Sequence, residues 1–234
     1  MKLFASAVVA ASVAQLASAQ TILYNFEPEL TAGVNGVALV EYQEFNSTKA
    51  NIFLNFDFSG VDQGAIRKSD GNCTSDVVQY KWHIHVNWNS LNGSESFNWC
   101  SKALTGNHYD PLKACGPNSE FVDTPECAPR VKDYACNPDN YAKNPLACEK
   151  GDLSGKFGDI KLTKDKTFSA QYTDVHYPLF SENTPQWNMI LHASCGKATP
   201  RIACAVGRQV FLTDDYWGSS DSSDSDDYNT PYSK

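Results

Sequence analysis

Two of the five histidines of the chain are separated by a single residue. His83 and His85 lie in the segment 80–86, in which apolar residues flank both of them, as is typical of a strand packed on a core. Successive side chains of a strand point to opposite faces, so the two imidazoles should project side by side from one face. Such a pair makes half of a nitrogen-rich metal site on a stiff support. Alone it is weak evidence, because two partly exposed strand histidines are the ordinary alternative.

Two further histidines lie in segments of different character. His108 lies in 106–111, which combines Gly, Asn, Asp and Pro and predicts a tight, ordered loop. His192 ends the apolar run 188–192. Three or four imidazoles brought together in an open arrangement would suit copper in either oxidation state.

Five short motifs of the chain follow one another in the order found in the copper/zinc superoxide dismutases. That family has an H-x-H strand, a G-x-H-aromatic-x-P loop, a G-D-L-x-G stretch, a strand ending in His, and an Arg three residues before a Cys. The counterparts here are His83 with His85, 106–111, 151–155, His192, and Arg201 with Cys204. The chain resembles this family over about residues 80–207.

Departures from the family pattern narrow the resemblance. No histidine lies between His108 and Asp152, and Glu149 stands where the family has its last zinc histidine. Only eight residues separate His192 from Arg201, fewer than in the charged loop that guides superoxide in the copper/zinc enzymes. Loss of the zinc ligands and of this loop is similar to the pattern of the copper-only superoxide dismutases, which are secreted proteins of fungi and oomycetes.

The resemblance implies a redox site with one copper per chain and no zinc. Its copper ligands would be His83, His85, His108 and His192. Arg201 would hold superoxide near the open copper face by charge-assisted hydrogen bonds. His108 matches the histidine that bridges both metals in the relatives, and without zinc its second nitrogen is free to take a proton when copper is reduced.

Two carboxylates complete the implied site. Glu149 and Asp152 would orient a ligating imidazole and relay protons where zinc fixes the geometry in the relatives. Glu149 could instead be a solvated loop acid, and Arg201 could pair with a nearby acid or cap the turn at Pro200. His176 has no counterpart among the ligands and is interpreted as a surface or turn histidine.

The eight cysteines predict disulfides, since the chain reads as a secreted protein and no spacing has the C-x-x-C form of structural zinc sites. The resemblance implies one bridge, between Cys100 and Cys204. The other six allow 15 pairings, among which sequence does not choose. Four of them lie between His108 and Asp152, so we hypothesise that disulfides hold the loop that zinc organises in the relatives; the six are Cys73, Cys115, Cys127, Cys136, Cys148 and Cys195.

Strand patterns occur nearly everywhere outside that loop. Alternating apolar residues predict strands in 34–45, 51–58, 156–162 and 167–172. We therefore predict an all-β fold, an antiparallel Greek-key β-sandwich or flattened barrel with long disulfide-strapped loops.

The two ends of the chain differ from the middle. Residues 1–19 read as a signal peptide, 20–213 as one copper superoxide dismutase-like domain, and 214–234 as an acidic, disordered Ser/Asp-rich tail. We expect a protein that is secreted, or held in the cell wall, without a membrane span. The net charge of −8 argues against nucleic acid as a partner. Three glycosylation sequons begin at Asn46, Asn72 and Asn92.

The residues leave several functions open. The first is a secreted superoxide dismutase that uses copper alone and takes superoxide as substrate. The second is a copper-binding or wall-associated domain of the same fold that does not turn over. A third, a dismutase that keeps zinc through Asp152, Glu149 and His108, is disfavoured because two carboxylates and one imidazole would hold zinc weakly. The sequence does not determine the oligomeric state, for which a monomer is favoured.

Overall fold

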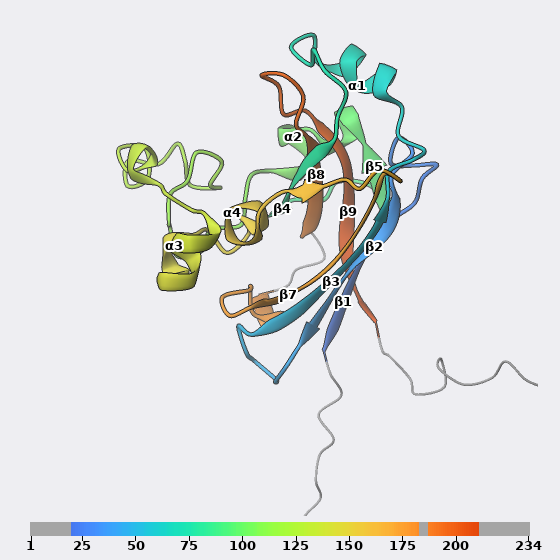
Figure 1. Ribbon diagram of the computed structural model, residues 1–234. Coiled ribbons are helices and arrows are strands. Elements are labelled where there is room, and N and C mark those ends of the chain that lie inside the picture. Colours follow the sequence, from blue (N-terminus) through green and yellow to red (C-terminus); the bar gives the residue numbers. More distant parts are fainter. Residues whose placement is uncertain (1–19, 183–186, 211–234) are drawn as a thin grey trace, which may run out of the picture.

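The computed structural model describes residues 20–182 and 187–210 and is built mainly of β-strands (Figure 1). The strands in this part of the chain are β1 Thr21–Phe26, β2 Asn35–Tyr42, β3 Ala50–Asp57, β4 Gln79–His85, β5 Ser94–Ser96, β6 Ile160–Lys161, β7 Thr167–Asp174, β8 Asn188–Ala193 and β9 Arg201–Val210. The α-helices are α1 Gln63–Ser69, α2 Lys102–Thr105, α3 Pro138–Lys143 and α4 Leu153–Phe157. Short 3-10 turns are η1 Phe97–Cys100, η2 Val131–Asp133, η3 Pro145–Ala147 and η4 Phe180–Glu182.

The strands form one antiparallel sheet that curves around an interior (Figure 1). Their order is β6-β4-β8-β9-β1-β2-β3-β7, with β5 beside β9. The long strand β9 pairs with β8 through its first half and with β1 through residues 207–210, so it belongs to both halves of the sheet. Consecutive strands β3 and β4 lie in different halves, as in Greek-key connections. The predicted all-β class is confirmed.

Alternating burial builds the core between the two halves. Ile22, Tyr24 and Phe26 of β1 are fully buried, and Trp82 and Ile84 of β4 face them from the other half. Burying each such side chain contributes about 1.5–3 kcal/mol. His83 and His85 therefore point away from this core, yet both are buried, because other segments cover their face of β4.

One predicted strand was partly wrong. The segment 156–162 contains a strand only at β6, because residues 153–157 form α4 instead. The Asp152 side chain caps α4 by accepting a hydrogen bond from the Gly155 N–H at 2.9 Å. Such a cap stabilises a helix start by about 1 kcal/mol. Lys156 then turns inward and is fully buried, which an alternating pattern does not predict.

All eight cysteines are paired. Cys100 is bonded to Cys204, the bridge that the resemblance implied, and Cys73 is bonded to Cys195. The other two bridges close short loops within the segment between His108 and Asp152; they are Cys115–Cys127 and Cys136–Cys148. If a disulfide acts by restricting the unfolded chain, each of these two short-loop bridges contributes about 3 kcal/mol to stability. The segment expected to be strapped by disulfides thus carries two of them.

The predicted signal peptide and acidic tail, together with residues 211–213 of the predicted domain, lie outside the described residues. In the part that is described, no helix has the length and apolar character needed to cross a membrane.

Candidate metal centre

Two loops cover the histidine face of β4. The backbone of Tyr109 donates to the Ile84 carbonyl at 3.0 Å, and the Ile84 N–H donates to the Gly151 carbonyl at 2.9 Å. The Gly151 N–H completes the contact with the Tyr109 carbonyl at 2.8 Å. A Cβ atom on Gly151 would lie 2.5 Å from the Ile84 carbonyl oxygen, so this close approach requires glycine. These bonds bring His108 beside β4 from one loop, and Glu149 and Asp152 from the other.

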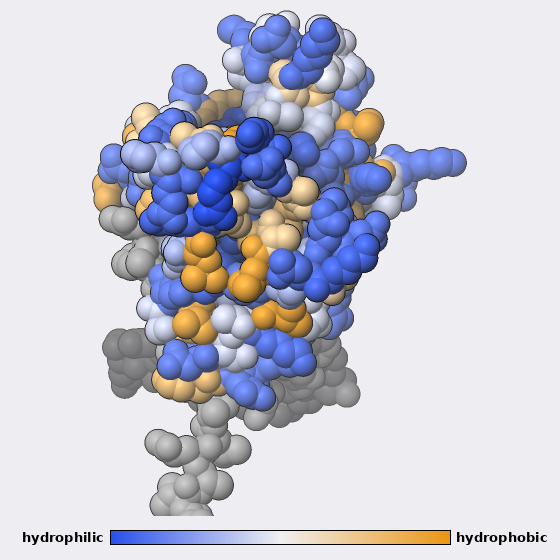
Figure 2. Space-filling view, turned by 90° about the vertical axis from the view of Figure 1, so that its left-hand side faces the viewer, coloured by the Kyte–Doolittle hydropathy of each residue, from blue (hydrophilic) through white to orange (hydrophobic). Residues whose placement is uncertain are grey.

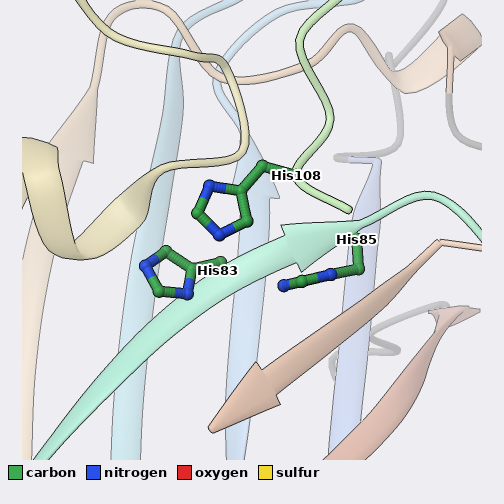
Figure 3. Close-up of side chains that lie close together, drawn as sticks. All are labelled: His83, His85 and His108. Atoms are coloured by element: carbon green, nitrogen blue, oxygen red, sulfur yellow. The ribbon is translucent and has the colours of Figure 1, made fainter. Parts of the chain in front are cut away.

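Four imidazoles meet at this place, and Figure 3 shows three of them turned toward one another. The ring centroids of His83 and His108 are 4.1 Å apart, and those of His85 and His108 are 5.0 Å apart. The His192 ring, from β8, is 5.1 Å from that of His83 and 5.8 Å from that of His85. Ligand atoms of His83, His85 and His108 all lie within 4.8 Å of one another.

Each of these histidines has one ring nitrogen that is buried and without a hydrogen-bond partner. These nitrogens are Nδ1 of His83 and Nε2 of His85, His108 and His192. A buried polar atom left unpaired is costly, and native proteins rarely keep one without a reason. Four of them in one cluster fit a cation that accepts imidazole lone pairs, and copper is such a cation.

The opposite ring nitrogens are held by the protein. Nδ1 of His85 lies 3.0 Å from the Gly106 carbonyl, and Nδ1 of His192 lies 3.2 Å from the Thr199 carbonyl. Because a carbonyl only accepts, each of these nitrogens carries the hydrogen, which leaves Nε2 with its lone pair. These contacts fix both the ring orientation and the tautomer that binds a metal.

The environment of His83, His85 and His192 favours neutral imidazoles, as metal ligands must be. Burial lowers the pKa of His83 and of His85 well below the usual value, and nearby imidazoles add to the effect. Burial also lowers the pKa of His192, to about 3.

Glu149 is a buried partner of His108. Its side chain is 1% exposed, and its Oε2 lies 2.6 Å from Nδ1 of His108. The alternative of a solvated loop acid is therefore wrong. Burial raises the pKa of this carboxyl, against the opposing influence of His108. Glu149 holds Nδ1 of His108, the nitrogen opposite the unpaired Nε2, so the expectation that this second nitrogen is free was wrong.

Asp152 lies beside His83. Its Oδ1 is 3.5 Å from Nε2 of His83, and its Oδ2 accepts a hydrogen bond from the Tyr134 hydroxyl at 2.7 Å. All four imidazoles thus have a protein acceptor near the nitrogen that faces away from the unpaired one.

Arg201 lies at the start of β9, on the side of His85 and His192. Its Nη1 donates to the Gly106 carbonyl at 3.0 Å and to Thr105 Oγ1 at 2.8 Å, with a longer bond to the Cys100 carbonyl. Burial lowers the pKa of the guanidinium to about 10. Arg201 pairs with no carboxylate among the described residues. The Gly106 carbonyl oxygen accepts hydrogen bonds from both Arg201 and His85, so Arg201 is linked to a candidate ligand through one backbone atom.

A cavity of about 330 Å³ opens over the His83 and His108 side of the cluster, and Lys81, Tyr134 and Asp152 also line it. A small anion could enter here. The Lys81 ammonium at this mouth lies 3.6 Å from Asp159, which offsets its charge, and its side chain is 43% exposed.

His176 is not part of the cluster. It occupies a turn after β7, as one alternative expected, but its side chain is buried, so the expectation of a surface residue was wrong. The turn is held inward because the His176 carbonyl accepts a hydrogen bond from the buried Lys156 at 3.0 Å.

Sequence analysis did not identify several residues that support the site. Tyr134 and the Thr199 carbonyl hold site residues but lie in no motif, and Gly106 begins the motif at 106–111 without any sign that its carbonyl holds His85. Carbonyl partners have no sequence signal, since every residue carries one. A second group with metal-ligand atoms, Asp110 with Cys115 and Cys127, is structural: both sulfurs are in a disulfide, and Asp110 accepts hydrogen bonds from two backbone amides.

The chain was compared with known proteins. No protein-family model matches it, and no curated protein matches its sequence. Among solved structures it is similar to superoxide dismutase 5 of Candida albicans in the Cu(II) form, at 19% identity and a TM-score of 0.49, covering 88% of this chain and 99% of that one. A variant of the same enzyme gives 17% identity over 87% of this chain and 98% of that one, with a TM-score of 0.49.

The clock protein EA4 is a third similar structure, at 13% identity and a TM-score of 0.45, covering 82% of this chain and 96% of that one. The neighbours thus include a superoxide dismutase. All of these likenesses are distant in sequence, so the chain's own residues must support any assignment of function.

Proposed function

We propose that the protein is a secreted superoxide dismutase that uses one copper per chain and no zinc. The observation that carries the proposal is the set of four unpaired, buried imidazole nitrogens on His83, His85, His108 and His192. Their lone pairs and fixed ring orientations fit copper. Bound copper would supply the one-electron chemistry that turns two superoxide ions into dioxygen and peroxide.

The residues around the histidines fit an anionic substrate. Arg201 is a fixed cation close to His85 and His192, and the loop that it binds holds the guanidinium in one place. A guanidinium can donate more than one hydrogen bond to a small oxyanion, and the interaction is charge-assisted. We assign to Arg201 the docking of superoxide.

His108 and Glu149 fit a role in proton handling. If Nε2 of His108 were free of copper and protonated, the imidazolium would be stabilised by the Glu149 carboxylate, 2.6 Å from Nδ1. The pair can therefore hold a proton next to the substrate position and keep the ring oriented when the proton leaves. General acid catalysis of this kind contributes about 10²–10⁴-fold to a rate.

Three observations support a site without zinc. The Glu149 carboxylate occupies Nδ1 of His108, the nitrogen that a second metal would need. The carboxylate of Asp152 accepts from the Tyr134 hydroxyl and from the Gly155 N–H. The segment between His108 and Asp152 offers no further histidine, whereas zinc sites in proteins favour nitrogen and sulfur ligands.

The histidines themselves provide the test. In purified full-length protein, His108→Ala and His192→Ala should each lower the affinity for copper and abolish dismutase activity. His176→Ala is the matched control, since that ring is buried outside the cluster. It should keep both copper and activity. Normal copper binding in His108→Ala would contradict the proposed site.

The same preparation separates the proposal from a non-catalytic copper-binding domain of this fold. Wild-type protein with one copper per chain should dismute superoxide, and chelation should remove the activity reversibly. Full copper loading without activity would favour the non-catalytic domain.

A further inference from the structure

The strapped segment, residues 115–148, carries the Cys115–Cys127 and Cys136–Cys148 bridges and lies on one side of the molecule, beside α4 (Figure 1). Figure 2 shows that this side is mostly hydrophilic, with hydrophobic residues in small separate groups. Such a surface does not mark a large docking site. Any effect of this segment on the histidine cluster must therefore depend on the contacts that it makes with the interior of the protein.

Tyr134 reaches inward between the two bridges. Its hydroxyl donates to Asp152 Oδ2 at 2.7 Å and accepts a hydrogen bond from the Glu149 N–H at 3.2 Å. One oxygen atom therefore joins the two acids that face His83 and His108. Among the hydrogen bonds of the described residues, these are the two by which the strapped segment reaches Glu149 and Asp152.

The ring of Tyr134 is packed as closely as its hydroxyl is bonded. A Cβ on Gly116 would lie 2.9 Å from Cε1 of Tyr134 and 2.3 Å from Oε1 of Glu149. The backbone of Gly116 thus fits against both side chains, where a larger residue would push them apart. Tyr134 also lines both the cavity over His83 and His108 and a second cavity of about 400 Å³, which Arg130 and Lys143 line as well.

Asp152 depends on this contact for its orientation. Its Oδ1 accepts from the Gly155 N–H at 2.9 Å and lies 3.5 Å from Nε2 of His83. The Tyr134 hydroxyl is the hydrogen-bond donor to its other oxygen. Without that donor the carboxylate is held only through Oδ1, by the Gly155 N–H, so the plane of the carboxylate and its direction toward His83 are less firmly fixed. Acceptors of this kind set the orientation and basicity of a ligating imidazole.

We propose that Tyr134 is a positioning residue, through which the strapped segment fixes Asp152 and Glu149 against the histidine cluster. The role of this cluster in copper binding rests on the function proposed above. The role of Tyr134 in holding the two acids does not, because it follows from hydrogen bonds within the chain.

The test is Tyr134→Phe in the full-length protein, which removes the hydroxyl and keeps the ring. Tyr42→Phe is the matched control, since the Tyr42 hydroxyl is also buried in a hydrogen bond, to the Pro178 carbonyl at 2.9 Å. Copper(II) affinity is measured by competition with a chelator, and the copper environment by electron paramagnetic resonance. Tyr134→Phe should weaken copper binding about 10-fold, at the lower end of such supporting contacts, and shift the copper spectrum. Tyr42→Phe should change neither.

A second measurement uses metal-free protein. The Glu149 amide donates to the Tyr134 hydroxyl, so its hydrogen exchange should accelerate in Tyr134→Phe and stay unchanged in Tyr42→Phe. Suppose that Glu149 exchange is faster in Tyr134→Phe but the copper-loaded wild-type protein shows no dismutase activity. This result would support the role of Tyr134 and contradict only the proposed dismutase function. Unchanged Glu149 exchange, or an unchanged copper spectrum and affinity in a folded Tyr134→Phe protein, would overturn the inference.

Discussion

At the scale of single residues, the site depends on which nitrogen of each imidazole is engaged. His85 and His192 present Nε2 because backbone carbonyls hold Nδ1, and His108 does so because Glu149 holds Nδ1. His83 is turned the other way, with Nε2 toward Asp152 and Nδ1 unpaired. A protein with these four residues in other tautomers would have the same sequence motifs but no common point for a metal.

Charge reversal at Arg201 tests substrate docking. Arg201→Ala removes a charge-assisted hydrogen bond worth about 1.5–3 kcal/mol, so kcat/KM should fall about 10–100-fold. Arg201→Glu should lower it further, because it repels an anion. Steady-state kinetics on copper-matched samples checks the order of the two variants. Equal rates would make Arg201 a residue that only holds the 100–106 loop.

Removing one charge at Glu149 tests the support of His108. Glu149→Gln keeps the shape of the side chain but loses the carboxylate 2.6 Å from Nδ1. We expect copper to stay bound and kcat to fall about 10-fold. Glu126→Gln, in an exposed pair with Lys113, is the control and should leave kcat unchanged. An unaltered kcat in Glu149→Gln would remove Glu149 from the mechanism.

At the scale of elements, alternation in the sequence was enough to place His83 and His85 on one face of β4. It was not enough to show that this face is covered, because the covering loops are held by backbone bonds to Ile84. The nearness of Glu149 to His108 followed from the resemblance to a family and from no pattern within the chain. The role of Tyr134 was not predicted, because no sequence pattern shows that its hydroxyl lies beside Asp152 and Glu149 in the folded protein.

The helix α4 was also not predicted, and its anchor can be tested. Lys156 and Asp174 are both fully buried and form an ion pair at 2.8 Å that ties α4 to the end of β7. Lys156→Met should reduce the free energy of unfolding by about 3–5 kcal/mol, because it leaves a buried carboxylate unpaired. Denaturation of oxidised protein by urea measures this loss.

Two variants serve as references for this loss. Lys156→Met combined with Asp174→Asn should lose less stability than the single variant, because no unpaired charge remains. Arg67→Ala breaks an exposed pair with Asp76 and should cost less than about 1 kcal/mol. A Lys156→Met protein as stable as wild type would show that the pair does not anchor α4.

At the scale of the whole molecule, a net charge of −8 gives no general attraction for an anion. For the dismutase proposed above, attraction of superoxide would therefore depend on a local cation beside the cluster, the guanidinium of Arg201. The three-dimensional surroundings of two glycosylation sequons, those at Asn46 and Asn92, also differ. Asn46 is exposed in the turn between β2 and β3, whereas the Asn92 amide donates to the buried Glu95 at 2.8 Å.

We therefore expect Asn46 to carry a glycan and Asn92 to remain unmodified in protein secreted from a eukaryotic host. A glycan on Asn92 would replace one hydrogen of the amide that donates to Glu95 and would crowd this bond, next to Ser94, which is fully buried in β5. Mass spectrometry of peptides after enzymatic deglycosylation identifies the modified sites. Full occupancy of Asn92 in folded protein would refute this expectation.

The central claim is a dismutase that works with copper alone, and metal analysis of fully active protein tests it most directly. Copper and zinc are measured by elemental analysis on the same samples as the dismutase activity, after metal-free protein has been loaded with copper, with zinc, or with both. The account predicts that activity rises in proportion to copper up to one ion per chain, and that added zinc is neither retained nor needed. Stoichiometric zinc in the most active samples would contradict it.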